Sequence, residues 1–119
     1  KVYEGGKVST ALHSKVVGDS VFVRGPTGRH RYTAPADGVR RDYGMVAGGS
    51  GITPMLQLIH AITEDPNDST NVSLLFANRT QEDILLREEL EQISAENGDQ
   101  IDVHHALSRE PEDSGWNGA

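Results

Sequence analysis

The sequence predicts an α/β fold whose second part is a parallel sheet crossed by helices, and three observations support this. Residues 43–107 alternate short apolar runs with longer amphipathic segments, in the order strand, helix, strand, helix, strand. The run Val72–Ala77 is almost wholly apolar, as expected of a parallel strand buried on both faces. A glycine-rich turn joins the first of these strands to the first helix. This order implies right-handed crossovers, with ligands bound beyond the carboxyl ends of the strands.

The stretch Met45–Met55 organises the chain. Apolar residues lead into three glycines that let a backbone approach a ligand closely, at positions Gly48, Gly49 and Gly51. Thr53 is expected to be the N-cap of the following helix, and Pro54 its first residue. A helix that starts after such a turn offers free N–H groups and a positive dipole end to a phosphate. The stretch is neither a Walker A loop nor a GxGxxG motif. It predicts an anion or dinucleotide site; the alternative is a plain strand-to-helix turn.

The elements of the second part follow from apolar periodicity. We expect strands and helices in alternation at Tyr43–Ala47, Pro54–Glu64, Val72–Ala77, Gln81–Glu96 and Ile101–Leu107. In the second helix, Leu86, Leu90 and Ile93 should face the sheet, and Asn97 with Gly98 should end the helix. These elements form the domain 43–119.

The first part has weaker signals. A brief helix is expected over about Val8–Ser14, a strand with alternating valines over Ser20–Arg24, and a candidate return strand over Arg31–Thr33. Residues 34–42 are rich in Pro, Gly and charge and are interpreted as a linker. The first domain is therefore predicted as 1–42, linker included.

Composition narrows the classes of function. The 119 residues have the size of one ordinary domain, include no cysteine for disulfides or thiolate metal sites, and contain no apolar run of membrane-spanning length. Residues 1–44 carry eight Lys and Arg against four Asp and Glu, a charge of +4, whereas residues 45–119 carry three against fourteen, a charge of −11. The basic part has few aromatics, which disfavours nucleic-acid binding. His104 and His105 are adjacent in a strand and point to opposite faces, so no metal site is predicted.

Four ordered motifs resemble one family. Glu4–Ser9, Arg24–Gly28, Ala47–Met55 and Leu75–Arg87 are similar in order and spacing to the ferredoxin–NADP reductase superfamily, and most of all to NADH–cytochrome b5 reductase and the flavin domain of nitrate reductase. The resemblance implies the end of an antiparallel FAD-binding β-barrel followed by the first half of a parallel-sheet nucleotide-binding domain. It also implies that the family's Arg-x-Tyr-Ser/Thr flavin motif lies before Lys1 and its Cys-Gly-Pro-Pro stretch after Ala119, so that the chain is an interior part of a longer protein.

The same resemblance assigns the candidate site residues. Gly6, Lys7, Val8 and Ser9 resemble the loop that holds the FAD pyrophosphate, although by themselves Ser9 would only start a helix and Lys7 would be a solvated charge. The nicotinamide coenzyme and the flavin ring are expected to meet the second loop, at Gly48, Gly49, Ser50, Gly51, Ile52, Thr53 and Pro54.

Asp83 and Arg79 bear on the choice of coenzyme. Asp83 matches a family acid near the adenosine ribose that favours NADH by repelling a 2′-phosphate. Its direct structural role could instead be a capping box with Thr80, or an ion pair with Arg87 four residues later. Arg79 could bind the 2′-phosphate of NADPH. The resemblance favours NADH over NADPH.

Two functions remain open at this point. The resemblance implies an FAD-dependent oxidoreductase that passes hydride from NADH to FAD and electrons to a haem protein such as cytochrome b5, fused or separate. The chemistry would reside in the flavin, since no residue is an obvious general acid or base. The alternative is a non-catalytic nucleotide-binding fragment. The expected location is the cytoplasm, or the cytoplasmic face of a membrane if an anchor precedes the chain.

Overall fold

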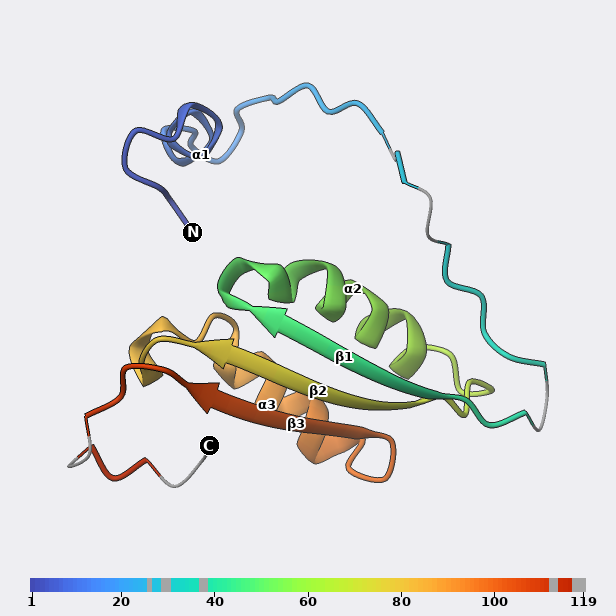
Figure 1. The fold of residues 1–119 in the computed structure, drawn as a ribbon. Coiled ribbons are helices and arrows are strands. Elements are labelled where there is room, and N and C mark those ends of the chain that lie inside the picture. Colours follow the sequence, from blue (N-terminus) through green and yellow to red (C-terminus); the bar gives the residue numbers. More distant parts are fainter. Residues whose placement is uncertain (26, 29–30, 37–38, 112–113, 117–119) are drawn as a thin grey trace. The chain divides into compact units, whose positions relative to one another are not determined.

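The computed structural model describes residues 1–25, 27–28, 31–36, 39–111 and 114–116 (Figure 1). The chain divides into two compact units, Lys1–Arg31 and Tyr32–Ala119, called here unit 1 and unit 2. Pro26 of the Arg24–Gly28 motif, together with residues 37 and 38 of the expected linker, lies outside the described residues. No helix among the described residues is long and apolar enough to span a membrane.

Unit 2 is built around a parallel sheet of three strands. Its elements, in chain order, are β1 (Asp42–Gly48), η1 (Gly49–Gly51), α2 (Ile52–Thr63), β2 (Asn71–Asn78), η2 (Gln81–Asp83), α3 (Arg87–Glu96) and β3 (Ile101–Leu107). The strand β2 lies between β1 and β3 and pairs in parallel with both (Figure 1). The predicted α/β class and the parallel sheet are confirmed.

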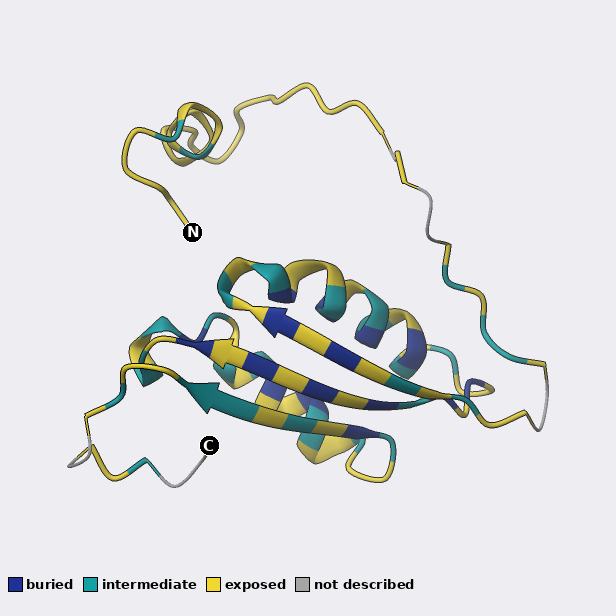
Figure 2. Ribbon diagram, viewed as in Figure 1, coloured by how far each residue is buried: buried dark blue, intermediate teal, exposed yellow. Residues whose placement is uncertain are grey.

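Among the described residues of unit 2, the helices cover one face of the sheet. Buried and exposed residues alternate along β1 and β2 (Figure 2). The buried face and both helices share one core, made of Met45, Ala47, Ile52, Leu56, Ile59, Ile62, Val72, Leu74, Phe76, Ile84, Leu90, Ile93 and Ile101. The prediction that β2 is buried on both faces is wrong here, because Leu75 is 44% exposed and its β1 neighbour Val46 is 72% exposed. Two crossovers of one hand that step in the same direction place both helices on the same face.

The glycine turn starts its helix earlier than expected. The first α2 residue is Ile52 and the N-cap is Gly51, so Thr53 is not the N-cap and Pro54 is the third helical residue. The Thr53 hydroxyl donates instead to the carbonyl of Ser50, at 3.2 Å. Proline is tolerated at this position because the first four N–H groups of a helix have no intrahelical partner. The helix itself is confirmed.

The segment after β2 is not one continuous helix. It forms the short turn η2, then leaves helical geometry at Ile84, and α3 begins only after Leu86, whose φ of 57° is left-handed. This break lets Ile84 enter the core, whereas Leu86, expected to face the sheet, is exposed. The inward positions Leu90 and Ile93 are confirmed. The predicted long helix is wrong because burial of Ile84 outweighed local helix propensity.

The described residues of unit 1 form one helix, α1 (Lys7–His13), close to the predicted position. None of its described residues is buried. Residues 20–24 and 31–33, predicted as strands, are in neither a helix nor a strand. A strand needs a neighbour for its N–H and C=O groups, and none pairs with these segments among the described residues. The barrel expected here is not formed by the described residues.

A polar network fixes the start of unit 2 at the amino ends of the strands. The hydroxyl of Tyr32 donates to the carboxylate of Asp68 and lies 3.1 Å from the hydroxyl of Thr70. Asp68 and Thr70 are both buried, and the Thr70 N–H donates to Asp68 at 2.9 Å. Burial opposes ionisation of Asp68, but hydrogen bonds from Thr70 and Tyr32 hold the pKa of its carboxyl below the usual value. This network attaches the segment before β1 to the sheet.

Candidate functional site

The carboxyl ends of the three strands meet at one edge of unit 2. Gly48 pairs with Ala77, and Asn78 pairs with Leu107, so β1, β2 and β3 end side by side. The glycine turn Gly49–Gly51 follows β1 directly, and the segment carrying Asp83 follows β2. The structure therefore brings the candidate residues of unit 2 to a single edge, the position where parallel sheets bind ligands.

The glycine turn leaves open space for a ligand. Gly49 has a left-handed φ of 48°, and a Cβ atom built at Gly48, Gly49 or Gly51 would have no neighbour within 4 Å among the described residues. No side chain caps the start of η1 or α2. Ile52 offers only its backbone, because its side chain is fully buried. A turn with free approach to its backbone and an uncapped helix start fits the phosphates of a dinucleotide.

Beyond β2 and β3, the two chain segments stay hydrogen-bonded. The N–H of Ser108 donates to the carbonyl of Asn78 at 3.1 Å, and the N–H of Arg109 donates to the carbonyl of Arg79 at 2.8 Å. Both arginines therefore lie at the carboxyl edge, joined through the backbone, and both are exposed. In the part of the chain that the structure describes, neither guanidinium has an ion-pair partner. An exposed arginine at this edge suits an anionic group of a ligand.

A carboxylate that the sequence analysis missed fixes the start of η2. Glu110 accepts hydrogen bonds from the backbone N–H of Gln81, at 2.9 Å, and from its side-chain amide, at 2.6 Å. The bonds from Gln81 hold the pKa of the Glu110 carboxyl below its usual value. Thr80 makes no capping hydrogen bond with its side chain, so its part of the predicted capping box is wrong. Asp83 and Arg87 belong to separate helices, and Arg87 pairs with Glu91 at 2.7 Å.

Next to this edge, the covered face of the sheet holds buried polar groups. Both side-chain polar atoms of Asn78, the Nδ1 of His105 and the indole nitrogen of Trp116 are buried and have no hydrogen-bond partner among the described residues. The His105 ring packs against Phe76 and Trp116, with centroids 5.7 Å and 6.4 Å away. Burial, assisted by Arg87, lowers the pKa of His105. No signal in the sequence pointed to this cluster.

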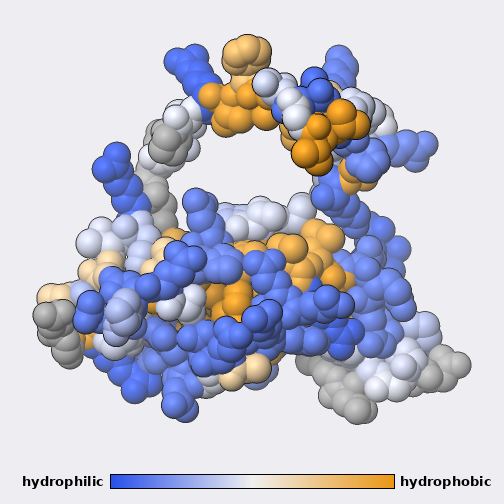
Figure 3. All heavy atoms as spheres, turned by 180° about the vertical axis from the view of Figure 1, so that it is seen from behind, coloured by the Kyte–Doolittle hydropathy of each residue, from blue (hydrophilic) through white to orange (hydrophobic). Residues whose placement is uncertain are grey.

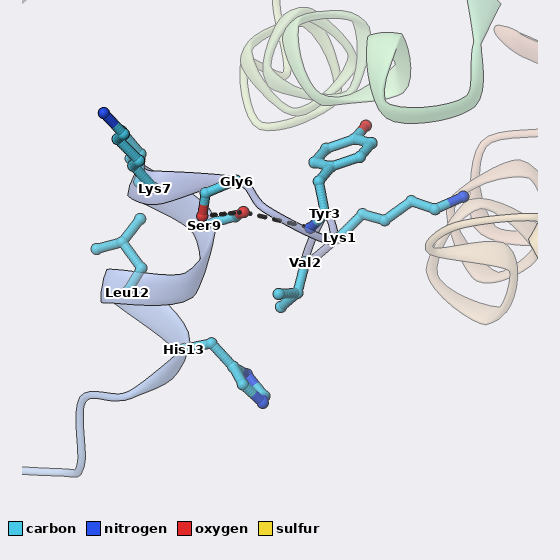
Figure 4. A pocket seen from close by; sticks show the side chains of 9 residues that line it. Lys1, Val2, Tyr3, Gly6, Lys7, Ser9, Leu12 and His13 are labelled. Atoms are coloured by element: carbon cyan, nitrogen blue, oxygen red, sulfur yellow. Dashed lines mark hydrogen bonds between the residues drawn. The ribbon is translucent and has the colours of Figure 1, made fainter.

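The candidate loop of unit 1 is held by a serine hydroxyl. Ser9 accepts from the N–H of Tyr3 and donates to the carbonyl of Gly6, both at 3.2 Å (Figure 4). Gly6 is confined, since a Cβ atom there would lie 2.4 Å from the Ser9 hydroxyl. Lys7 extends away from this turn in Figure 4. A hollow of about 740 Å³ is lined by Lys1, Val2, Tyr3, Gly6, Lys7, Val8, Ser9, Leu12 and His13.

The loop and its hollow fit a phosphate-bearing cofactor with an apolar body. Gly6, Lys7, Val8 and Ser9 all line the hollow, and no side chain caps the start of α1. Over the described residues, no group of three or more His, Asp or Glu side chains is placed to hold a metal ion. These features suit a nucleotide, while no cluster suggests a metal centre in the described part.

Two different family profiles match the two parts of the chain. The profile described as "Oxidoreductase NAD-binding domain" matches residues 45–119. The chain belongs to this family. A second profile, "Oxidoreductase FAD-binding domain", matches residues 1–32. The two profiles thus cover the segments that carry the two candidate loops.

Individual relatives agree with the family. The chain is 47% identical to NADH-cytochrome b5 reductase 2 of Homo sapiens, over 95% of this chain and 45% of the relative. It is 47% identical to NADH-cytochrome b5 reductase 1 of Lodderomyces elongisporus, over 98% of this chain and 37% of the relative. The chain thus spans less than half the length of these curated relatives.

A solved structure gives the same result. The cytochrome b5 reductase domain of Ulva prolifera nitrate reductase matches with a TM-score of 0.84 at 39% identity, over 96% of this chain and 45% of that one. Ferredoxin-NADP+ reductase from Plasmodium falciparum, at 19% identity and a TM-score of 0.71, shares the fold. The resemblance to the ferredoxin–NADP reductase superfamily, and within it to cytochrome b5 and nitrate reductases, is confirmed. The roles of the individual site residues stay predictions.

Proposed function

We propose that this chain is part of an FAD-dependent oxidoreductase that takes hydride from NADH and delivers electrons to a haem protein. The observation that carries the proposal is the open glycine turn at the carboxyl end of β1, within a segment that belongs to the NAD-binding family. In balance, one NADH and two ferric haems give NAD+, one proton and two ferrous haems. The flavin, when bound, supplies the step from a two-electron donor to a one-electron acceptor.

The chain's own residues would bind and orient the cofactors. In unit 1, the backbone around Gly6 and Lys7 would receive the FAD pyrophosphate, with the Lys7 ammonium adding charge. In unit 2, the absence of side chains at Gly48, Gly49 and Gly51 would let the coenzyme reach the backbone of the turn. Thr53 would present its hydroxyl to the flavin ring. Because this hydroxyl donates to the Ser50 carbonyl, it would meet the flavin as an acceptor, through the lone pairs of its oxygen. No proton transfer by a side chain is needed.

Absorption spectroscopy tests this proposal. The purified protein that carries the chain should show a flavin spectrum, and NADH added without oxygen should bleach it. Oxidised cytochrome b5 added afterwards should be reduced, with two haems per NADH consumed. A protein without flavin absorption, or one whose flavin ignores NADH, would contradict the proposal. That result would favour the second reading, a non-catalytic nucleotide-binding fragment.

The choice between NADH and NADPH is a finer question. We propose NADH as the physiological donor, because the relatives described above are named NADH-cytochrome b5 reductases. One observation favours acceptance of NADPH as well: Arg79 lies at the carboxyl edge, is exposed, and has no ion-pair partner within the described residues. An arginine can hold a 2′-phosphate, whereas the Asp83 carboxylate would repel it.

Kinetics with both coenzymes separates these effects. Asp83→Thr should raise kcat/KM for NADPH relative to NADH, since a negative charge near the ribose is removed. Arg79→Gln should lower the same ratio. Lys15→Gln in unit 1 is the control and should change neither. If Asp83→Thr lowers stability while the coenzyme ratio stays constant, Asp83 has only a structural role.

The haem partner would dock through charge. We propose an acidic, cytochrome b5-like acceptor that meets the basic residues 1–44, whose net charge of +4 contrasts with −11 for the rest. Rim charges mainly affect the encounter rate and are screened by salt. Reversing Lys15 and Arg31 to Glu should slow reduction of cytochrome b5 at low salt and much less at high salt. A neutral dye acceptor is the control, and an unchanged rate at low salt would place docking elsewhere.

The cellular location follows from the resemblance alone. We propose the cytoplasm, or the cytoplasmic face of a membrane if an anchor precedes the chain. Fractionation of cells that express the complete protein tests this: activity should be found in the cytosol, or on membranes in a form that added protease destroys without detergent. Protection from protease would contradict the proposal.

A further inference from the structure

The loop between β2 and α3 has little structure of its own to keep it in place. Only three of its residues form a helical turn, η2, and both ends of that turn leave helical geometry. The loop nevertheless carries Arg79 and Asp83, which lie at the carboxyl edge where the coenzyme is proposed to bind. Its position must therefore be set by contacts from elsewhere in unit 2.

Ile84, buried in the core, holds the end of the loop, and the segment after β3 holds its start. The backbone of this segment continues the ladder past the strands, through Ser108 to Asn78 and Arg109 to Arg79. Glu110 then closes the ladder with one carboxylate oxygen on the backbone N–H of Gln81 and the other on its side-chain amide. Both bonds go to the first residue of η2, so this single carboxylate fixes both the direction and the rotation of the turn. Charge-assisted hydrogen bonds of this kind are stronger than neutral ones.

We propose that Glu110 is the positioning residue for the coenzyme-contacting loop 79–83, a role that rests on the proposed binding of NADH at this edge. Glu110 itself touches Gln81 and not the coenzyme. It acts by holding the backbone that presents Arg79 and Asp83. Loss of the carboxylate therefore weakens binding of the adenosine half of the coenzyme, while hydride transfer from a bound coenzyme continues.

Steady-state kinetics of the purified flavoprotein tests this role. Glu110→Ala should raise the KM for NADH and the inhibition constant of ADP-ribose about tenfold, the order expected when an ionised hydrogen-bond partner is lost. The kcat for ferricyanide reduction at saturating NADH should stay within about twofold, as expected when binding alone is affected. In the double variant Gln81→Glu with Glu110→Gln, the amide of residue 110 donates to the carboxylate of residue 81, and its carbonyl oxygen still accepts from the backbone N–H. Both hydrogen bonds are restored, and both constants should recover.

The matched control lies in α3. Glu96 accepts a similar hydrogen bond from the amide of Gln92, at 2.8 Å, on an exposed helix face. Glu96→Ala removes a Gln–Glu pair of the same kind and should change neither constant. If Glu110→Ala fails to fold, Gln81→Ala replaces it: this variant keeps the backbone bond, loses only the amide bond and should raise both constants by a smaller factor.

Each other outcome is decisive. If the wild type binds NADH and ADP-ribose but Glu110→Ala and Gln81→Ala bind them equally well, the positioning role is overturned. The same holds if Glu110→Ala lowers thermal stability and leaves the inhibition constant of ADP-ribose unchanged, because Glu110 is then only a structural tie. If the wild type itself binds neither ligand, the proposed function is overturned, and the inference with it.

Discussion

The two units of the chain hold their candidate loops in different ways. In unit 2, the glycine turn lies between a strand and a helix that share a core of thirteen buried residues. In unit 1, no described residue is buried, and hydrophobic groups lie at the surface (Figure 3). The loop of unit 1 is fixed by local hydrogen bonds of the Ser9 hydroxyl. The candidate loop of unit 2 is thus preorganised by packing, whereas the candidate loop of unit 1 depends on its own short-range bonds.

The largest expected difference in the free energy of unfolding is between alanine substitutions of two phenylalanines, one in each unit. Phe76 is fully buried at the centre of the sheet, and Phe22 in unit 1 is fully exposed. Phe76→Ala should lower the free energy of unfolding by about 3–5 kcal/mol, whereas Phe22→Ala should change it by less than about 0.5 kcal/mol. Urea unfolding followed by circular dichroism measures both. Equal losses would show that unit 1 is as well packed as unit 2.

A smaller effect is expected from Tyr32, where unit 2 begins. Tyr32→Phe removes the hydroxyl that bonds to Asp68 and Thr70, and leaves buried polar groups less satisfied. The free energy of unfolding should fall by about 1–3 kcal/mol at neutral pH. The loss should shrink in acid: a lowered Asp68 pKa gives stability that is present above the ordinary Asp pKa and disappears as pH falls through the folded-state value. Urea titrations at several pH values test this; a loss independent of pH would contradict the role of Asp68.

The smallest stability effect concerns the adjacent histidines of β3. Burial lowers the pKa of His105, so below the ordinary His pKa the unfolded chain binds a proton that the folded unit resists. Stability should therefore fall as pH drops from about 7 towards 5, around the ordinary His pKa. His105→Phe should flatten this dependence. His104→Phe is the control, since His104 lies exposed on the other face, 2.7 Å from Asp102. Identical pH profiles for wild type and His105→Phe would contradict the assignment.

The sequence was most informative where local signals and burial agree. The order of strands and helices in unit 2 could be predicted because each element carries its own apolar period and the crossovers leave few topologies. The glycine turn was also found, since its glycines are a local feature. The predicted N-cap, Thr53, lies two positions after the observed one, Gly51, because N-cap preference alone does not fix where the first helical residue lies.

What the sequence could not predict depends on distant contacts. Glu110 bonds to a residue 29 positions away, and no local pattern marks such a pair. The break at Leu86 follows from the burial of Ile84 against strands predicted separately. Valine alternation in 20–24 predicted a strand, but alternation does not supply a pairing partner. The polar cluster of Asn78, His105 and Trp116 was equally invisible for this reason.

The central claim is that a coenzyme approaches the backbone of the glycine turn, and Gly51 tests it most directly. Gly51 has right-handed helical φ and ψ values, and a Cβ atom there meets nothing within 4 Å in the described structure, so Gly51→Ala should fold normally. A Cβ atom at Gly44, near the amino end of β1, also meets nothing within 4 Å in the described structure. Gly44→Ala is therefore the matched control.

The deciding measurement is an anaerobic titration of the flavoprotein with NADH, followed by flavin bleaching. We expect Gly51→Ala to weaken NADH binding by about tenfold or more, because a methyl group of this kind fills the space that a ligand needs, and tenfold corresponds to only about 1.4 kcal/mol. Gly44→Ala should bind NADH as the wild type does, and both variants should keep their flavin spectrum and thermal stability. If Gly51→Ala binds NADH as tightly as the wild type, the coenzyme does not approach this turn, and the account is contradicted.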